Sequence, residues 1–185
     1  MTTTSIIRAI VATTAVVVAL GVAGCGGSES EPHPEGSDTH VHIDPLDPDT
    51  LPPEKVAETA MNAILSWQPA ADTSKADAVR RARPWLGGDL AAQAATPAPA
   101  PTGMRPDAKW EAWSRSKDSL TAACTVADDT PAHPDGMRTV IVDVRCRQTV
   151  LHTTGSSTTL AAERWRTTVT ATDDGWRLTD FRFRS

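Results

Sequence analysis

The sequence is short of aromatic residues other than tryptophan, and short of positive charge. It contains no tyrosine, two phenylalanines and six tryptophans, so tryptophan must supply much of the aromatic packing of any core. Lysine and arginine total 18 against 23 acidic side chains, and most of the acidic excess lies in residues 29–58. Because no basic stripe is left to neutralise phosphates, the composition argues against nucleic acid or anionic lipid as the main partner.

A hydrophobic run long enough to cross a membrane comfortably is also missing from the N-terminus. After Arg8, residues 9–23 carry no charge, but this stretch is short for about 30 Å of hydrocarbon and is followed by Gly-Gly-Ser-Glu after a cysteine. These features are typical of a secretory signal peptide. Residues 22–25, Val-Ala-Gly-Cys, resemble the bacterial lipobox.

The lipobox resemblance implies that residues 1–24 are a signal peptide removed on export, and that the sulfur of Cys25 carries a diacylglyceryl group. Two or more acyl chains, such as palmitate, attach a protein stably to a membrane. We therefore expect a lipoprotein anchored to the extracytoplasmic face of the bacterial cell membrane through Cys25. A non-lipidated secretory signal and an uncleaved anchor are the alternatives. The abundance of Ala, Thr, Asp and Arg, with little Lys, indicates a high-GC genome such as that of an actinobacterium.

Residues 25–51 form the expected link between the lipid and the folded domain. They are rich in Gly, Ser, Pro and acidic residues and nearly free of apolar ones, which is typical of a disordered acidic tether. Imidazole and carboxylate groups suit Zn, Cu or Ni, and the tether offers several of them: His33, Asp38, His40, His42 and Asp44. A solvated tail without metal is the interpretation that we favour.

Two cysteines remain once Cys25 is lipidated, and in an oxidising compartment Cys124 and Cys146 allow only one intramolecular pairing. Neither has a nearby histidine or cysteine at metal-ligand spacing, so a reactive thiol or a metal pair is the weaker alternative. The sequence therefore predicts a Cys124–Cys146 disulfide and no metal site.

The first half of the predicted domain, which covers residues 52–185, reads as helices. After a Pro-Pro pair, apolar residues recur every three or four positions, and a second segment lies between capping residues and a proline. The predicted helices are residues 52–67, 72–83 and 87–95, followed by a Pro-rich connector at residues 96–106.

The second half reads as strands, because apolar and polar residues alternate along it. The predicted strands are residues 120–126, 140–147, 160–172 and 176–184. A turn at residues 134–136 makes the first two strands antiparallel, with Cys124 opposite Cys146 and Val126 opposite Val144.

The alternation changes phase in the last predicted strand. Trp176 and Leu178 share one face, whereas Phe181 and Phe183 fall on the other. We interpret this as a bulge, or as a strand covered on both sides near its end, and either would bring Asp180 close to the core.

Helices followed by a curved antiparallel sheet resemble the NTF2-like fold, also named the cystatin-like cone. The similarity covers about residues 53–183, and it rests on four short segments: Trp67-Gln68-Pro69, Arg83-Pro84-Trp85-Leu86, Trp110-Glu111-Ala112-Trp113 and Asp174-Gly175-Trp176-Arg177-Leu178. It implies an α+β domain in which N-terminal helices pack on the sheet. The layout is similar to VirB8-type and TcpC-type conjugation proteins and to Mce-associated proteins, many of which have a transmembrane helix where this chain has a predicted lipid anchor.

Residues for catalysis are hard to find. Enzymes that resemble this cone, such as ketosteroid isomerase, use an interior carboxylate with hydroxyl donors. Asp143 falls on a polar strand face, which leaves only Asp180 for the interior. His133 and His152 fall in turns or at strand ends, and no serine sits in a nucleophile elbow. We therefore predict no enzymatic activity and no cofactor.

Two groups of residues are candidates for contact with a partner. Trp110 and Trp113 follow the connector in a polar context. A basic strip would form on the outer sheet face if its strands are neighbours, with an ordinary solvated face as the alternative: Arg145, Arg147, Arg164 and Arg166. We predict a non-catalytic scaffold or protein-interaction domain in an envelope transport, secretion or conjugation assembly. The alternative is a small-molecule binder that uses the mouth of the cone.

Overall fold

Helices precede strands along the chain, as the sequence patterns predict. The computed structural model describes residues 47–96 and 107–185, so the predicted signal peptide, Cys25, the tether histidines and most of the connector lie outside the described residues. The elements are α1 (Pro53–Ile64), α2 (Ala76–Arg81), the 3-10 helix η1 (Arg83–Trp85), α3 (Gly88–Ala95), α4 (Ala108–Ser116), β1 (Ser119–Val126), β2 (Thr139–Leu151), β3 (Ser157–Thr159), β4 (Glu163–Thr172) and β5 (Gly175–Arg184).

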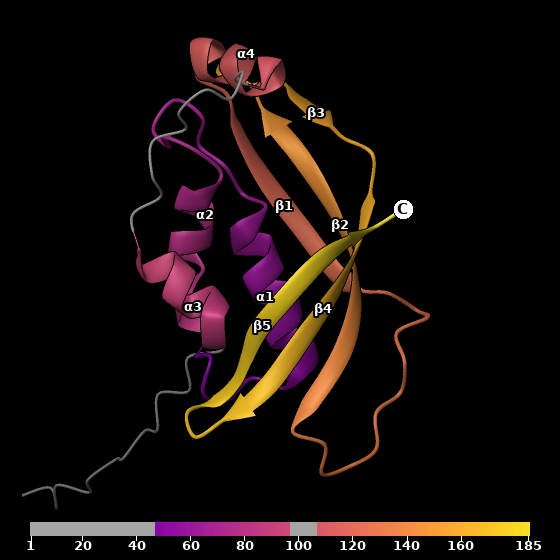
Figure 1. Cartoon of the computed structure of the whole chain (residues 1–185). Coiled ribbons are helices and arrows are strands. Elements are labelled where there is room, and N and C mark those ends of the chain that lie inside the picture. The colour runs from indigo at the N-terminus through magenta and orange to yellow at the C-terminus, as the bar shows by residue number, and fades with distance from the viewer. Residues whose placement is uncertain (1–46, 97–106) are drawn as a thin grey trace, which may run out of the picture. The chain divides into compact units, whose positions relative to one another are not determined.

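The strands form one antiparallel sheet in the order β1-β2-β4-β5, and the short β3 pairs with the end of β2. The sheet is curved and does not close into a barrel, and α1, α2 and α3 lie on one of its faces (Figure 1). The predicted α+β architecture is therefore confirmed. No helix in the described residues is long and apolar enough to cross a membrane.

The register of β1 and β2 is the predicted one. Cys124 pairs with Cys146 and Val126 with Val144, and the two cysteines are joined in a disulfide. Both sulfur-bearing side chains are buried on the sheet face that carries the helices. The alternation of apolar and polar residues places both cysteines on the inner face, and the register of the two strands brings them opposite one another.

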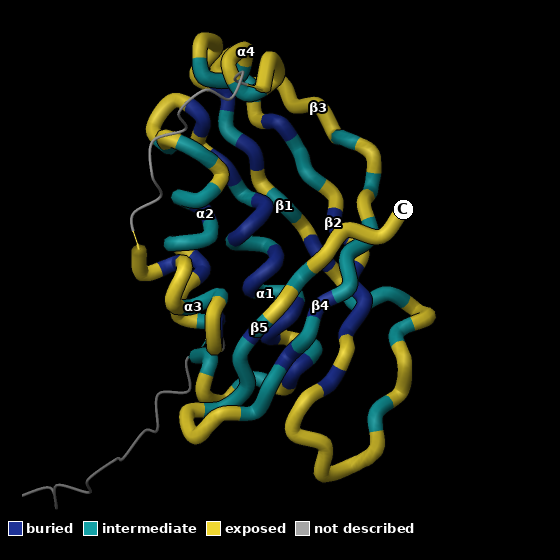
Figure 2. The backbone as a smooth tube through the Cα atoms, in the orientation of Figure 1, coloured by how far each residue is buried: buried dark blue, intermediate teal, exposed yellow. Residues whose placement is uncertain are grey.

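The core lies between α1 and the inner face of the sheet. Val56, Ala60 and Ile64 recur on one side of α1, and they are buried against inward residues such as Val142 and Leu178. Figure 2 shows the buried backbone running along α1 and the middle of β2 and β4. Each such aliphatic side chain contributes about 1.5–3 kcal/mol on burial, so this contact holds the helical layer to the sheet.

Several element boundaries differ from the predicted ones. α1 ends at Ile64, and Trp67 instead forms a β-bridge with Leu120, so this tryptophan belongs to the sheet edge and not to the helix. The second helix is shorter than predicted at both ends, because it begins at Ala76 and ends at Arg81, and Arg83 belongs to η1. α4 was not predicted, although Asp107 caps it by accepting a hydrogen bond from the Lys109 N–H at 3.0 Å.

The phase change in β5 is a bulge. Leu178 pairs with Val169 and Asp180 with Thr168, which leaves one extra residue on β5. Phe181 and Phe183 therefore return to the same inner face as Leu178. Asp180 is exposed, because its pairing with Thr168 puts it on the outer face. The expectation that Asp180 lies close to the core is wrong.

The free edge of β1 is closed by groups from α1 and the segment after it. The N–H of Leu120 donates to the carbonyl of Trp67 at 2.8 Å. Further along β1, three backbone N–H groups donate to side chains spaced four residues apart: Ala122 to Ser66 at 3.0 Å, Cys124 to Asn62 at 2.6 Å and Val126 to Glu58 at 2.9 Å. Unpaired strand edges invite association with other chains, so these contacts protect this side of the sheet.

The last residues of the predicted tether lie against the domain. Residues 47–50 form a turn, and the carboxylate of Asp49 accepts a hydrogen bond from Arg177 on β5 at 2.5 Å. A Cβ on Gly175 would meet the backbone of Asp49 at 2.8 Å, so glycine is needed where the turn crosses β5. Ordered contacts with the domain thus begin several residues before α1.

Candidate functional site

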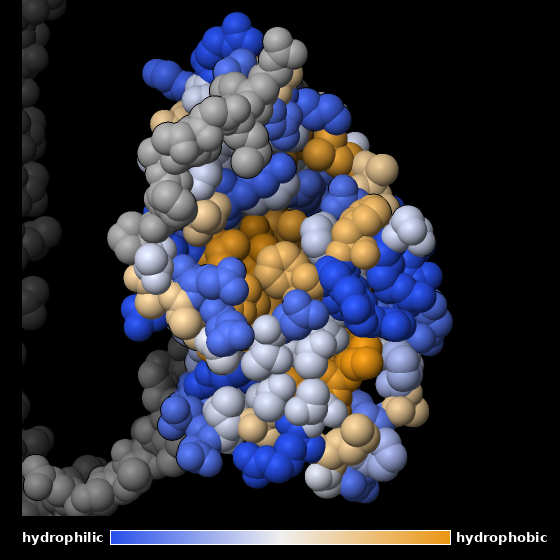
Figure 3. Space-filling view, in the orientation of Figure 1, coloured by the Kyte–Doolittle hydropathy of each residue, from blue (hydrophilic) through white to orange (hydrophobic). Residues whose placement is uncertain are grey.

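An apolar groove lies between α2 and α3 on one side and β4 and β5 on the other. It consists of two hollows of about 740 and 510 Å³, which share Ala76, Val79 and Phe181 in their walls. Figure 3 shows the groove as an apolar depression that opens to solvent on this face of the molecule. We refer to the combined surface as the apolar groove; its main apolar residues are Ile64, Leu65, Trp67, Val79, Leu90, Trp165, Phe181 and Phe183.

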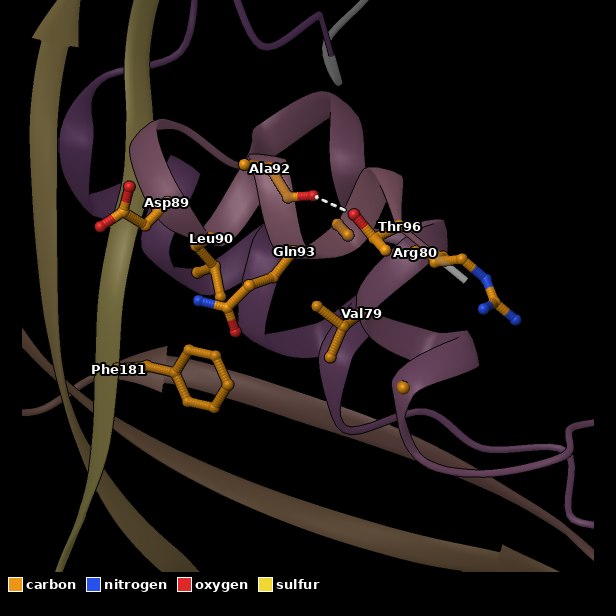
Figure 4. A pocket seen from close by; sticks show the side chains of 10 residues that line it. Val79, Arg80, Asp89, Leu90, Ala92, Gln93, Thr96 and Phe181 are labelled. Carbon is orange, nitrogen blue, oxygen red and sulfur yellow. Dashed lines mark hydrogen bonds between the residues drawn. The ribbon is translucent and has the colours of Figure 1, made fainter. Parts of the chain in front are cut away.

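The wide end of the apolar groove lies between Phe181 and helix α3. The ring of Phe181 faces Leu90, Gln93 and Val79 across the hollow (Figure 4). Phe181 points inward only because the bulge in β5 resets the alternation of that strand. The sequence irregularity therefore places an aromatic ring on the floor of the groove.

The distance between α3 and β5 is set by a close backbone approach at Gly87. Its N–H donates to the carbonyl of Leu178 at 2.9 Å, and a Cβ at this position would meet the Cβ of Arg177 at 2.8 Å. A larger residue would force α3 away from β5 and change the width of the groove. Gly87 is thus a positioning residue for the site.

The narrow end of the apolar groove contains an aromatic cluster. The ring of Trp165 lies 5.9 Å from that of Phe181 and 5.5 Å from that of Phe183, the latter in an edge-to-face arrangement. The indole N–H of Trp165 is covered and has no hydrogen-bond partner among the described residues. Phe183, beside it, is 55% exposed. Buried polar groups are normally hydrogen-bonded, so this unpaired donor beside an exposed phenylalanine sets the cluster apart from a closed core.

The outer face of the same strands carries the predicted basic strip, and the strands are neighbours as that prediction requires. In the register of β2, β4 and β5, three arginines stand side by side, Arg145 opposite Arg164 and Arg164 opposite Arg184. Like charges directly opposite one another destabilise a sheet unless acidic groups compensate. The strip also continues onto β5, so its members are Arg145, Arg147, Arg164, Arg166, Arg182 and Arg184.

Part of this charge is neutralised within the domain. Asp143, whose side chain is 1% exposed, accepts two hydrogen bonds from Arg166, both at 2.8 Å, and one from Arg184 at 2.6 Å. The hydrogen bonds from Arg166 hold the pKa of Asp143 below its usual range, and the charge of Arg184 lowers that pKa further. Arg164 pairs with Asp129 and lowers the pKa of that carboxyl in the same way.

The remaining arginines of the strip are available to a partner. Arg145, Arg147 and Arg182 are exposed, and none of them forms an ion pair with a described residue. Of the four predicted contact arginines, Arg145 and Arg147 thus present free guanidinium groups, whereas Arg164 and Arg166 are held by carboxylates. Arg182 was not predicted, although Arg182-Phe-Arg continues the same alternation.

The two candidate contact tryptophans lie on α4 and are less exposed than the sequence analysis expects. Both Trp110 and Trp113 are half-buried and pack against the edge of the core. The ring of Trp110 lies 6.0 Å from that of Trp67, and the Nζ of Lys75 lies over the Trp67 ring at 4.5 Å from its centroid. These rings therefore join α4 to the sheet.

The two loop histidines are tied to carboxylates. His133 lies 2.8 Å from Glu54 through its Nε2. His152 lies 3.0 Å from Asp118 through Nδ1 and 2.9 Å from the hydroxyl of Thr158 through Nε2. A hydrogen bond from Ser116 and the contact with His152 lower the pKa of Asp118. The arrangement links the ends of α4, β2 and β3. The pairing of His152 with Asp118 could not be predicted from the sequence, because the two residues are 34 positions apart.

No metal site is found in the part of the chain that the structure describes, where no three His, Cys, Asp or Glu side chains gather. The apolar groove and the basic strip are two surfaces of these residues whose groups are not all engaged in internal contacts. The groove is apolar with a polar rim that includes Lys75, Arg80, Asp89 and Glu163. It can bind apolar side chains or an apolar small molecule, and the strip can bind carboxylates.

Comparisons with known proteins identify no family. No protein-family model matches the chain, and no curated protein matches it. Among solved structures, the intermembrane space region of the chloroplast protein ARC6 is similar over 71% of this chain and 96% of that one, at 14% sequence identity and a TM-score of 0.32. A likeness this weak carries no argument, so the function is inferred below from the geometry of the chain itself.

Proposed function

We propose that this chain is a lipoprotein, anchored through Cys25 to the extracytoplasmic face of a bacterial membrane, whose domain binds a protein of a transport, secretion or conjugation assembly. The domain is proposed to be an NTF2-like cone, which is supported by the way α1 lies across a curved antiparallel sheet (Figure 1). The N-terminal sequence supports the anchor through its uncharged stretch and the Val-Ala-Gly-Cys segment.

The observation that carries the proposal is the open apolar groove with an exposed aromatic side chain at its mouth. Phe183 is 55% exposed beside Trp165, and the adjoining hollows open to solvent. Apolar surface gathered in one place and bordered by charged residues marks interaction sites on proteins that are otherwise monomeric. A buried small ligand needs a cavity that encloses most of its surface, which an open groove does not provide.

The proposal is tested by placing a photo-crosslinking amino acid at position 183 of the full chain, expressed in its own host. The matched control is the same amino acid at Leu151, which is 45% exposed but lies at the far end of β2. We expect one defined envelope protein to be crosslinked from position 183 and not from position 151. Equal products at the two positions, or none at either, would contradict the proposal.

The anchor is tested separately by the Cys25→Ala variant. We expect this variant to be lost from the membrane fraction, whereas Ser28→Ala, a change in the same segment, stays there. Retention of the Cys25→Ala variant in the membrane would show that lipid on this cysteine is not the attachment.

A second candidate function, binding of a small apolar molecule, is favoured by one observation. The indole N–H of Trp165, at the narrow end of the apolar groove, is a donor without a partner among the described residues. A ligand with an apolar body and an acceptor oxygen that reached this N–H would supply the missing hydrogen bond. Native mass spectrometry of the chain purified from its host distinguishes the two, because a co-purified molecule lost on denaturation supports the small-molecule function.

A further inference from the structure

The two edge strands of the sheet, β1 and β5, differ in how many of their outward backbone groups have a hydrogen-bond partner. The edge of β1 is closed along its length by α1 and the segment after it, whereas the described residues supply one backbone hydrogen bond to the outer edge of β5, from the N–H of Gly87 to the carbonyl of Leu178. That contact is part of a parallel bridge between Leu86 and Leu178. Beyond the bridge, residues 179–184 have no further backbone partner on that side among residues 47–96 and 107–185.

We propose that residues 179–184 of β5 accept an extended segment of a partner protein as an additional strand, with apolar and acidic residues alternating along that segment. The proposal rests on the proposed function and names the kind of partner that the site takes. Strand addition uses the unpaired backbone of an edge for affinity, and pockets for alternate side chains for specificity. The free stretch is as long as a typical strand of about five or six residues.

The inner side of an added strand would face the apolar groove. Neighbouring residues on adjacent strands share a face, so every second side chain of the segment would lie beside Phe181 or Phe183. Below them the 740 Å³ hollow, walled by Val79 and Leu90, has room for several aliphatic side chains. This side therefore selects apolar residues.

The outer side of the same strand would face the end of the basic strip. Arg182 lies on this face, because it pairs with Arg166 across β4 and β5, and it is exposed without an ion pair in the described residues. A carboxylate on the added strand opposite Arg182 would form the pairing that Arg166 and Arg184 already make with Asp143. Asp180 is exposed on the same face, but Arg182 and Arg184 outnumber it, so charge complementarity favours acidic residues at the positions between the apolar ones, above all opposite Arg182.

A second copy of this chain fits the edge less well. If β5 paired with β5 of another copy in antiparallel fashion about Arg182, the two Arg182 side chains would stand opposite one another. Arg184 of each chain would stand opposite Asp180 of the other, but Arg184 is already paired with Asp143. Like charges in opposite positions destabilise a strand pair. The chemistry of the edge therefore favours a different protein with acidic residues.

The test uses a short synthetic peptide in which valine and glutamate alternate, added to the full chain in detergent. Hydrogen exchange followed by mass spectrometry should show protection of residues 179–184, and the Trp165 fluorescence should change. Two isomers of the peptide are compared: one carries an N-methyl group on every valine backbone nitrogen, and the other carries one on every glutamate backbone nitrogen. Successive N–H groups of a strand point to opposite edges, so only one isomer should lose affinity, by roughly tenfold or more.

Charge reversal supplies the matched control. Arg182→Glu should weaken binding of the valine–glutamate peptide by roughly tenfold and improve binding of a valine–lysine peptide, because the outer positions then face the opposite charge. Lys109→Glu, an exposed change on α4 away from β5, should do neither.

Equal loss of affinity for both methylated isomers, no protection of residues 179–184, or a dimer joined through β5 would each overturn strand addition. If crosslinking from position 183 still finds a protein partner in the host, the proposed function stands while this inference fails. If that crosslinking fails as well, both are wrong.

Discussion

The closure of the β1 edge by α1 gives the sharpest prediction about stability. Asn62→Ala removes the acceptor for the N–H of Cys124, a bond of 2.6 Å beside a residue that is 6% exposed. An unpaired N–H in such a position costs about 1–3 kcal/mol. Alanine is the better helix former by roughly 0.5 kcal/mol, which offsets part of this cost. We expect a net loss of about 1–2 kcal/mol in the free energy of unfolding, with Tm lower by about 3–10 °C.

The assay is urea unfolding of the full chain in detergent, followed by tryptophan fluorescence. The matched control is Thr59→Ala, since Thr59 lies on the same helix and no hydrogen bond of its hydroxyl is found in the described residues. The control should change the free energy of unfolding by less than about 0.5 kcal/mol. If Asn62→Ala is as stable as Thr59→Ala, the side chain of Asn62 does not satisfy the strand edge, and the reasoning about edge closure is wrong.

Three further predictions concern an ion pair, the disulfide and a glycine. Asp143→Asn should cost about 1–3 kcal/mol at neutral pH, because two arginines lose their carboxylate. Because the pKa of Asp143 is lowered in the folded chain, its carboxylate stabilises the fold at pH values above its ordinary pKa of 3.8, and this contribution is lost as the pH falls through the folded-state pKa. The Asp143→Asn variant has no such contribution to lose, so its stability should fall less than that of the parent chain in acid unfolding. Replacing Cys124 and Cys146 together by alanine should cost about 3 kcal/mol for a loop spanning 22 residues, measured by urea unfolding; equal stability would exclude the disulfide from the folded chain. Gly87→Ala should cost about 1–3 kcal/mol and weaken any binding in the groove, because the added methyl meets Arg177; an unchanged Tm and affinity would contradict the close approach.

The sheet could be predicted from the sequence because its information is local. Alternation along residues 120–126 and 140–147 fixed which side chains face inward, and the turn between them fixed the register that joins Cys124 and Cys146. The bulge in β5 could also be recognised, since the change of phase between Leu178 and Phe181 is visible in the sequence. What that bulge does to Asp180 was not predictable, because the face of a bulged residue depends on which partner it pairs with.

The candidate site was predicted less well, for a physical reason. The alternation of arginines indicated the basic strip, but Asp143 and Asp129 neutralise part of its charge. Asp143 comes close to Arg166 only through the pairing of β2 with β4, and Asp129 reaches Arg164 from the loop after β1. The apolar groove depends on the spacing between α3 and β5, which Gly87 sets through a contact with a distant strand. Trp67 was assigned to a helix by its spacing, although tertiary pairing with Leu120 places it at the sheet edge. Contacts between distant segments leave little trace in a single sequence.

The contacts between α1 and β1 also bear on when the chain can fold during synthesis. Asn62 and its partner Cys124 are 62 residues apart, and the bonds from Glu58 and Ser66 span 68 and 56 residues. A ribosome delivers the N-terminal segment first, so α1 must wait for β1 before its polar groups find partners, and pairings this distant close slowly. Until then the apolar side of α1 is exposed. We therefore expect the exported chain to stay unfolded until β1 and β2 have crossed the membrane, and chains cut before Ser119 to be degraded.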